Sequence, residues 1–555
     1  MNKKVCSFPI LFALLALLIG TCAVVFPASA QAAPTSTGSI TVSGTVASSY
    51  DAYQIFSANV VDGDSDAKIA TDLAWANDAA RDAALPVLHS AGMPNSQTTA
   101  QEAAEWLNTD SHLTSALSAQ LARSLQSSGA EPVALNAGTA AELPCGYWLI
   151  VAKDDAIAQG EAGTAPIMAL VGGSAVTVKP KAATPKVAKH VLEDSTAAWG
   201  KAADATVADD LYWRLSATVP AGLTAYDTYA VQFVDTMSAG LDPSKVAASM
   251  RVYVAAGADG GFDAVPTGKD GHADTEPAKG WTDITAQCVT KMAADGTFTV
   301  RTGDLIAALG GADAFTAGAR VVAVYNAPLS SACSHGIAKG NPNEVYLRYP
   351  RSPFADQSGD AGFTRTPSDD ACAYTWDLAL TKRGSDGDKP LAGAVLSIAD
   401  DRGRTLAADG TWDAEGKATV TTGEDGRVTV SGVDSGKLKV RELKAPKGYT
   451  AFEGARSVTV KAEGLDVDQV AAAKPKLTIT AESPLRADSA DGSTGSLEAS
   501  LINTPTGTPP SITTGGFMPS TGDMAMYAAA AAAVAGAALI VVALLVKRGG
   551  GSHKE

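Results

Sequence analysis

Short runs in which apolar and polar residues alternate recur along most of the chain, separated by Gly, Asp and Pro. Such runs lie at 39–43, 147–151, 211–215, 320–325 and 427–430. Alternation with a period of two residues is typical of strands that bury one face, and closely spaced turn residues favour antiparallel sandwiches. We therefore predict a mainly β chain built from several β-sandwich domains.

One stretch follows a helical pattern instead. Thr99 and Glu102 have the spacing of a capping box, which satisfies free backbone amides at the start of a helix. Downstream, leucines recur every four residues, a period that places them on one helical face; they are Leu113, Leu117, Leu121 and Leu125. We predict a helical insertion within the first β domain.

Both ends of the chain carry long apolar runs. Residues 1–30 begin with two lysines and end in Ala28-Ser29-Ala30, the pattern of a secretory signal peptide, with Ala33 as an alternative cleavage point. Residues 524–546 are apolar enough and long enough for a transmembrane helix. Lys547 and Arg548 then predict that 547–555 is a cytoplasmic tail.

Polar and Pro-rich joints divide the rest of the chain. We predict β domains at 38–181, 184–365 and 372–504, then a Pro/Thr/Gly linker at 505–517. The linker has too little apolar content to fold by itself.

Composition excludes several functions. The net charge of −16 gives no basic footprint for nucleic acid. Asp62, Asp64 and Asp66 resemble the start of a calcium loop, but Ala67 and Leu73 occupy positions that need Gly and Glu. Neither a Gly-x-Ser-x-Gly elbow nor a phosphate-binding loop occurs. We expect no metal, no cofactor and no enzymatic activity.

Four cysteines remain after removal of the signal peptide, and they allow three disulfide pairings. Cys288 and Cys333 fall in one predicted domain, so we predict that pair.

The residues 518–522, Met518-Pro519-Ser520-Thr521-Gly522, precede the apolar run and its basic end. This order resembles the Leu-Pro-x-Thr-Gly sorting signal of Gram-positive surface proteins. The resemblance implies that the transpeptidase sortase cuts between Thr521 and Gly522.

The residues 176–181, Val176-Thr177-Val178-Lys179-Pro180-Lys181, resemble the pilin motif, a Val-rich strand that ends in Tyr-Pro-Lys. In that family the motif lysine supplies the amine that sortase joins to the next subunit. The resemblance implies Lys181, with Lys179 as the alternative because it replaces the family's Tyr.

The third domain resembles a collagen-adhesin B-type domain. The similar segments are Leu380-Thr381-Lys382, the Glu-containing 440–449 and Leu501-Ile502-Asn503. The resemblance implies an intramolecular isopeptide bond between Lys382 and Asn503, promoted by Glu442.

The middle domain resembles the corresponding domain of sortase-assembled pilus backbone subunits, and its matching residues are Lys189 and Asp235. The family usually has Tyr-Ser-Asn where this chain has Tyr349-Pro350-Arg351. We therefore predict a degenerate site here, without an isopeptide bond by the usual route.

These resemblances imply tandem immunoglobulin-like or transthyretin-like β-sandwich domains and a shaft subunit of a covalent pilus. Its implied partners are sortase, other pilin subunits, peptidoglycan and a host-surface ligand. It would be exported, bound briefly to the membrane and displayed at the cell wall of a Gram-positive bacterium. The alternative is a monomeric adhesin anchored to peptidoglycan, which needs the sorting signal but not Lys181.

Overall fold

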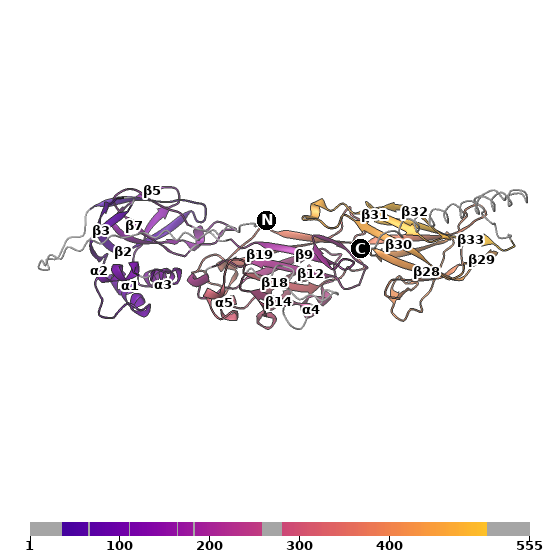
Figure 1. Cartoon of the computed structure of the whole chain (residues 1–555), viewed down its shortest axis with the longest axis horizontal. Helices are drawn as coiled ribbons and strands as arrows, with labels where there is room; N and C mark the ends of the chain where they lie inside the picture. Colours follow the sequence, from indigo (N-terminus) through magenta and orange to yellow (C-terminus); the bar gives the residue numbers. More distant parts are fainter. Residues whose placement is uncertain are drawn as a thin grey trace, which may run out of the picture.

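The computed structural model describes residues 36–507, except 65–66, 110, 164, 181–183, 222 and 258–279. Three groups of strands follow one another along the long axis of the molecule (Figure 1). The fold is mostly β, as the alternating pattern predicted.

The N-terminal group combines two sheets with three helices. A three-stranded sheet has the order β5-β1-β8, and a five-stranded sheet has the order β3-β2-β6-β7 with β4 beside β2. One hydrophobic core lies between the sheets and a second lies beneath the helices. The elements are β1 (Thr37–Val42), β2 (Ser49–Asp62), β3 (Lys68–Trp75), α1 (Asp78–Ser90), α2 (Ala100–Asn108), α3 (Ser115–Ser127), β4 (Val133–Asn136), β5 (Ala140–Pro144), β6 (Gly146–Ala152), β7 (Ile167–Val171) and β8 (Val176–Val178).

The helical insertion is confirmed, including its capping box: the Thr99 side chain accepts from the Glu102 amide, and Glu102 bonds back to the Thr99 amide. Leu117, Leu121 and Leu125 are buried along α3. The prediction that Leu113 lies on the same helical face was wrong, because Leu113 precedes α3 and is exposed.

The middle group is a sandwich of a six-stranded sheet, β10-β9-β12-β18-β14-β15, and a seven-stranded sheet, β11-β21-β19-β13-β17-β16 with β20 beside β19. A large apolar core fills the space between them. The elements are β9 (Val187–Glu193), β10 (Ala198–Gly200), β11 (Ala202–Asp204), β12 (Tyr212–Thr218), β13 (Gln232–Met237), α4 (Val246–Ser249), β14 (Arg251–Ala255), β15 (Trp281–Asp283), β16 (Val289–Met292), β17 (Thr297–Arg301), α5 (Leu305–Ala308), β18 (Arg320–Asn326), β19 (Asn341–Pro350), β20 (Phe363–Arg365) and β21 (Asp369–Tyr374).

The third group is a second sandwich. Its five-stranded sheet has the order β27-β22-β33-β29 with β32 beside β33, and its seven-stranded sheet has the order β25-β24-β23-β28-β30-β31 with β26 beside β23. The elements are β22 (Trp376–Gly384), β23 (Val395–Ala399), β24 (Thr405–Leu406), β25 (Trp412–Asp413), β26 (Val420–Thr421), β27 (Arg427–Val433), β28 (Gly436–Lys444), β29 (Tyr449–Thr450), β30 (Ala455–Glu463), β31 (Lys476–Ala481), β32 (Leu485–Asp491) and β33 (Ser496–Pro505).

The boundary between the last two domains differs from the prediction. Strand β21 pairs with β19 in the middle domain and extends to Tyr374, beyond the predicted end at 365. Cys372, where we expected the third domain to begin, therefore belongs to the middle domain. Only Thr375 separates β21 from β22, so no polar linker marks the boundary in the sequence.

The predicted disulfide is wrong for this structure, in which Cys288 and Cys333 are free thiols. Each lies in its own loop against the middle-domain core. The Cys288 thiol donates to the carbonyl of Ile284 at 3.3 Å, whereas the Cys333 thiol lies beside His335.

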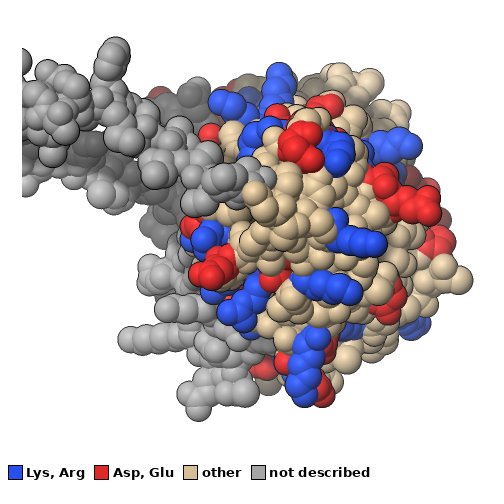
Figure 2. All heavy atoms as spheres, turned by 90° about the vertical axis from the view of Figure 1, so that its right-hand side faces the viewer, with Lys and Arg blue, Asp and Glu red and all other residues tan. Residues whose placement is uncertain are grey.

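The surface of the third domain carries both signs of charge. At the end of the molecule that faces the viewer in Figure 2, Lys and Arg side chains are interspersed with Asp and Glu among uncharged residues. Such mixing keeps a surface soluble without creating a field of one sign.

Within the described residues, no helix has the length and apolar character needed to cross a membrane. The predicted signal peptide, the 524–546 helix and the 547–555 tail all lie outside those residues.

Candidate functional site

Three predicted residues of the third domain lie together in its core. Lys382 is on β22, the first strand of the domain, and Asn503 is on β33, the last strand. The two strands are parallel neighbours, with Lys382 opposite Leu501 and Gly384 opposite Asn503. Because side chains alternate across a strand, Asn503 shares the inward face of Leu501. Glu442 reaches the same point from β28 in the facing sheet.

The contacts within this cluster are short. Lys382 Nζ lies 3.5 Å from Glu442 Oε1, and Asn503 Nδ2 donates to both Glu442 oxygens at 2.8 and 3.0 Å. Lys382 and Asn503 are 0% and 2% exposed. Asn503 Oδ1 is buried without a hydrogen-bond partner among the described residues. A half-turn of this amide would place Oδ1 at Glu442, where a protonated carboxyl group could donate to it.

The surroundings shift Lys382 toward its neutral form. Burial lowers the pKa of Lys382 to about 8, although the nearby Glu442 opposes the change. An amine whose pKa lies near ambient pH spends part of its time as a nucleophile.

A second buried lysine lies between the sheets of the middle domain. Lys189 on β9 forms an ion pair with Asp235 on β13, and both are 0% exposed. Lys189 Nζ also donates to the Tyr325 hydroxyl at 2.9 Å, which donates to Asp235 Oδ2 at 3.0 Å. Burial lowers the pKa of Lys189 to about 8 and raises the pKa of Asp235. Both shifts favour the uncharged forms.

The structure adds a residue that the sequence analysis missed. Asn343 on β19 is 0% exposed, and its Nδ2 donates to the Tyr325 hydroxyl at 2.8 Å. Its Oδ1 has no hydrogen-bond partner among the described residues. Lys189 and Asn343 therefore meet at one hydroxyl, and Asp235 lies beside it. The middle domain thus contains the carboxamide that we had expected it to lack.

The signal for Asn343 is present in the sequence. Along β19 every second position from 341 to 349 is buried, and Pro350 at the end of the strand is buried as well. An Asn in such an inward row, among Val, Leu and Tyr, is costly unless it has polar partners. We had looked for the acceptor at Tyr349-Pro350-Arg351, near the end of the strand.

Arg351 instead joins the middle domain to the N-terminal domain. Its guanidinium donates to the Asp154 carbonyl at 3.1 Å, and its own carbonyl accepts from the Gly163 amide at 2.7 Å. An Asn side chain would be too short to make the first contact.

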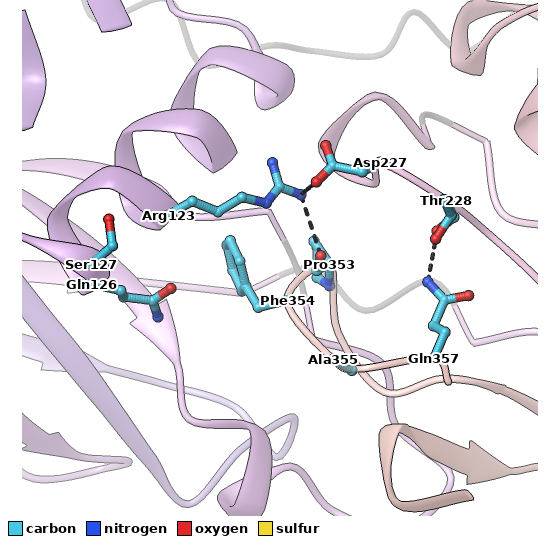
Figure 3. A pocket seen from close by; sticks show the side chains of 9 residues that line it. All are labelled: Arg123, Gln126, Ser127, Asp227, Thr228, Pro353, Phe354, Ala355 and Gln357. Carbon is cyan, nitrogen blue, oxygen red and sulfur yellow. Dashed lines mark hydrogen bonds and ion pairs between the residues drawn. The ribbon is translucent and has the colours of Figure 1, made fainter. Parts of the chain in front are cut away.

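A cavity of about 420 Å³ lies at the same joint (Figure 3). Arg123 extends from α3 across it and donates to the carbonyls of Ala225 and Pro353 at 2.9 and 3.3 Å. It also pairs with Asp227 at 3.2 Å and lies over the Phe354 ring. These contacts hold the first two domains in a defined orientation.

The residues implied in intermolecular joining are only partly described. Lys179 follows β8 and is exposed, and the Val178 carbonyl before it accepts from the Ser43 amide at 2.8 Å. Lys181, Thr521 and Gly522 lie outside the described residues.

The sheets and the two buried lysine clusters together define a multidomain β-sandwich protein with a Lys, a carboxyl group and an Asn in each of two cores. Residues 377–474 match the family described as "SpaA: Prealbumin-like fold domain". This match covers most of the third domain.

The chain is also similar to individual proteins. It is 32% identical over 120 residues to the trypsin-resistant surface T6 protein of Streptococcus pyogenes serotype M6, an alignment that covers 20% of each chain. Among solved structures, the T6 backbone pilin of that serotype is 17% identical, with 85% of this chain and 98% of that chain covered and a TM-score of 0.45. The full-length major pilin SpaD of Corynebacterium diphtheriae is 15% identical, with 85% and 98% covered and a TM-score of 0.41.

The family match shows a prealbumin-like fold domain in the third domain, and the curated relative shows that part of the chain is similar to a streptococcal surface protein. The chain spans about a fifth of the length of that relative.

Proposed function

We propose that this chain is the structural subunit of a covalently polymerised surface pilus and that it is not an enzyme. The observation that carries the proposal is the buried Lys382–Glu442–Asn503 cluster within the domain that matches the prealbumin-like family. A buried lysine beside a carboxamide serves little purpose in a simple core, because apolar residues of similar volume would be at least as stable.

In the proposed crosslinking step, the neutral Lys382 amine attacks the Asn503 side-chain carbonyl carbon. Glu442 polarises the carbonyl and then carries a proton from the attacking nitrogen to the departing one. An amide forms between Lys382 and Asn503, and one ammonia leaves. The fold supplies the high effective concentration that the step needs.

We propose the same step in the middle domain, between Lys189 and Asn343. Asp235 is the carboxyl group, and its raised pKa suits a group that must be protonated to polarise the carbonyl. Tyr325 positions the reactants, because its hydroxyl contacts all three side chains.

Such bonds suit a protein that transmits force. In the third domain the bond would join β22 and β33, the first and last strands, so tension applied at the two ends could not separate them. Resistance of this kind is kinetic as well as thermodynamic.

Between subunits, sortase would form a thioester with Thr521 and release the segment that starts at Gly522. The amine of Lys181, or of Lys179, in another copy would then attack the thioester and free the sortase thiol. Since donor and acceptor lie on different parts of the chain, repetition gives an open filament rather than a closed ring. The base of the filament would be joined to peptidoglycan, and adhesion to a host surface would be its use.

The alternative, a monomeric adhesin anchored to peptidoglycan, uses the same sorting signal. Cell-wall fractions boiled in detergent distinguish the two. A ladder of masses that disappears in a Lys181→Arg, Lys179→Arg double variant supports the pilus, whereas a single band in the wild type supports the adhesin and overturns the pilus.

A further inference from the structure

A thiol, an imidazole and a carboxylate meet where the middle and third domains join. Cys333 and His335 lie in the loop between β18 and β19, and Asp377 lies on β22. The Cys333 thiol sulfur is 3.6 Å from His335 Nε2, and His335 Nδ1 is 2.8 Å from Asp377 Oδ1, an ion-pair contact that lacks hydrogen-bond geometry. The arrangement exists only when the two domains are docked, since each contributes part of it.

This cluster is accessible from solvent. The side chains of His335 and Asp377 are 26% and 32% exposed, and Cys333 is half-buried. Ser331 and Ala332, just before the cysteine, are exposed. Cys333 is therefore less enclosed than Cys372, which is buried.

We propose that Cys333 is the nucleophile of a thiol–disulfide exchange site, with His335 as its base and Asp377 as the residue that positions the imidazole. The chemical class of its substrate is a low-molecular-weight disulfide. This proposal does not depend on the pilus function.

The step balances without any other reagent. His335 Nε2 takes the thiol proton, and the Cys333 thiolate attacks one sulfur of the disulfide R–S–S–R. The S–S bond of the reagent breaks as a Cys333–S–S–R bond forms, and R–S⁻ leaves. The imidazolium then returns the proton to give R–SH. The negative charge of Asp377 stabilises the imidazolium during the step.

The base is necessary because the thiol alone is a poor acid. Burial raises the pKa of Cys333, and the charge of Asp377 raises it further. An isolated thiolate is thus disfavoured. Transfer of the thiol proton to His335 instead gives a thiolate–imidazolium ion pair, whose net charge is zero. Cys288 offers a contrast: burial raises its pKa to about 11, and its thiol donates to a backbone carbonyl.

The surrounding backbone favours exchange over acyl transfer. The amides of Cys333, Ser334 and Gly336 already donate to the Ser330 carbonyl, Asn341 Oδ1 and the Thr375 carbonyl. These amides are therefore not free to stabilise an oxyanion, which acyl transfer requires. Exchange at sulfur develops no such oxygen charge.

The test is the rate of mixed-disulfide formation with oxidised glutathione on the purified full chain, followed at individual cysteines by peptide mass spectrometry from pH 5 to 9. We expect Cys333 to react at pH 7 about tenfold faster than Cys288, and His335→Gln to remove that advantage. In the His335→Gln variant the rate should rise continuously with pH, as for an unassisted thiol, whereas the wild type should level off. Asp377→Asn should lie between the two.

Cys288 is the internal control for folding, because its rate should be the same in all variants. The proposal is overturned if Cys333 reacts no faster than Cys288, or if His335→Gln leaves the rate and pH profile of Cys333 unchanged. It is equally overturned if the variant accelerates Cys288 as much as it slows Cys333, since the effect would then be structural.

Discussion

Replacing Glu442 by Gln tests the crosslink in the third domain with minimal change of shape. Glutamine keeps an oxygen that can accept from Asn503 Nδ2 or from the Phe452 amide, both of which contact Glu442. It cannot carry a proton between the two nitrogens. We therefore expect the fold to survive while the bond between Lys382 and Asn503 fails to form.

The size of the effect follows from the strand positions. A bond from β22 to β33 closes a loop of about 120 residues, and the chain-entropy treatment used for disulfides assigns such a loop about 5 kcal/mol. For a domain of this size, that corresponds to a fall of about 15–25 °C in the melting temperature. Mass spectrometry should show the wild type lighter than its sequence mass by about 17 Da for this bond, the mass of one ammonia, and the variant without that loss.

The matched control is Glu498→Gln, on the exposed face of β33, where Glu498 pairs with Arg427 at 3.1 Å. Exposed ion pairs contribute little, so this variant should melt within a few degrees of the wild type and retain the ammonia loss. If Glu442→Gln keeps the crosslink, Glu442 is not the proton carrier. If the wild type shows no Lys382–Asn503 peptide at all, the reasoning about this cluster is wrong.

Three further predictions concern the other domains. Asn343→Ala should abolish a Lys189-containing crosslinked peptide in trypsin digests while leaving the third-domain crosslink intact; a persistent Lys189 crosslink would exclude Asn343 as acceptor. Arg351→Ala should loosen the joint between the first two domains, seen as faster hydrogen exchange around Asp154 with unchanged exchange in the third domain; equal protection in both proteins would refute this. Burial and the charge of Asp204 raise the pKa of Glu193 from 4.5 to about 7, so the folded state holds the proton more tightly and stability should fall as pH rises through that interval. Glu193→Gln should flatten this dependence in melting curves, and an unchanged slope would contradict it.

The features that could be predicted from the sequence are those encoded by residues close together along the chain. The β class and the helical insertion follow from periodicity over a few residues, and both are observed. The cluster of Lys382, Glu442 and Asn503 was predicted because each residue lies within a short segment that resembles a family motif. The structure shows that the three strands bring those residues to one point.

The failures involve signals that are not local. Asn343 was missed because we sought the acceptor only at the motif position near Tyr349. The alternating pattern along this strand nevertheless places Asn343 on the inward face. The domain boundary was misplaced because β21 passes into β22 through a single residue. Cysteine pairing depends on where loops lie in space, and spacing along the chain does not determine that.

The central claim is that copies of this chain are joined through a terminus and a side chain. Its most direct test is mass spectrometry of digested high-mass polymer from the cell wall. We predict a branched peptide in which the carboxyl group of Thr521 forms an amide with the Nζ of Lys181, or of Lys179. If Thr521 is found joined only to peptidoglycan amines, or if peptides that extend unbroken through Gly522 predominate, the chain is not a polymerising subunit.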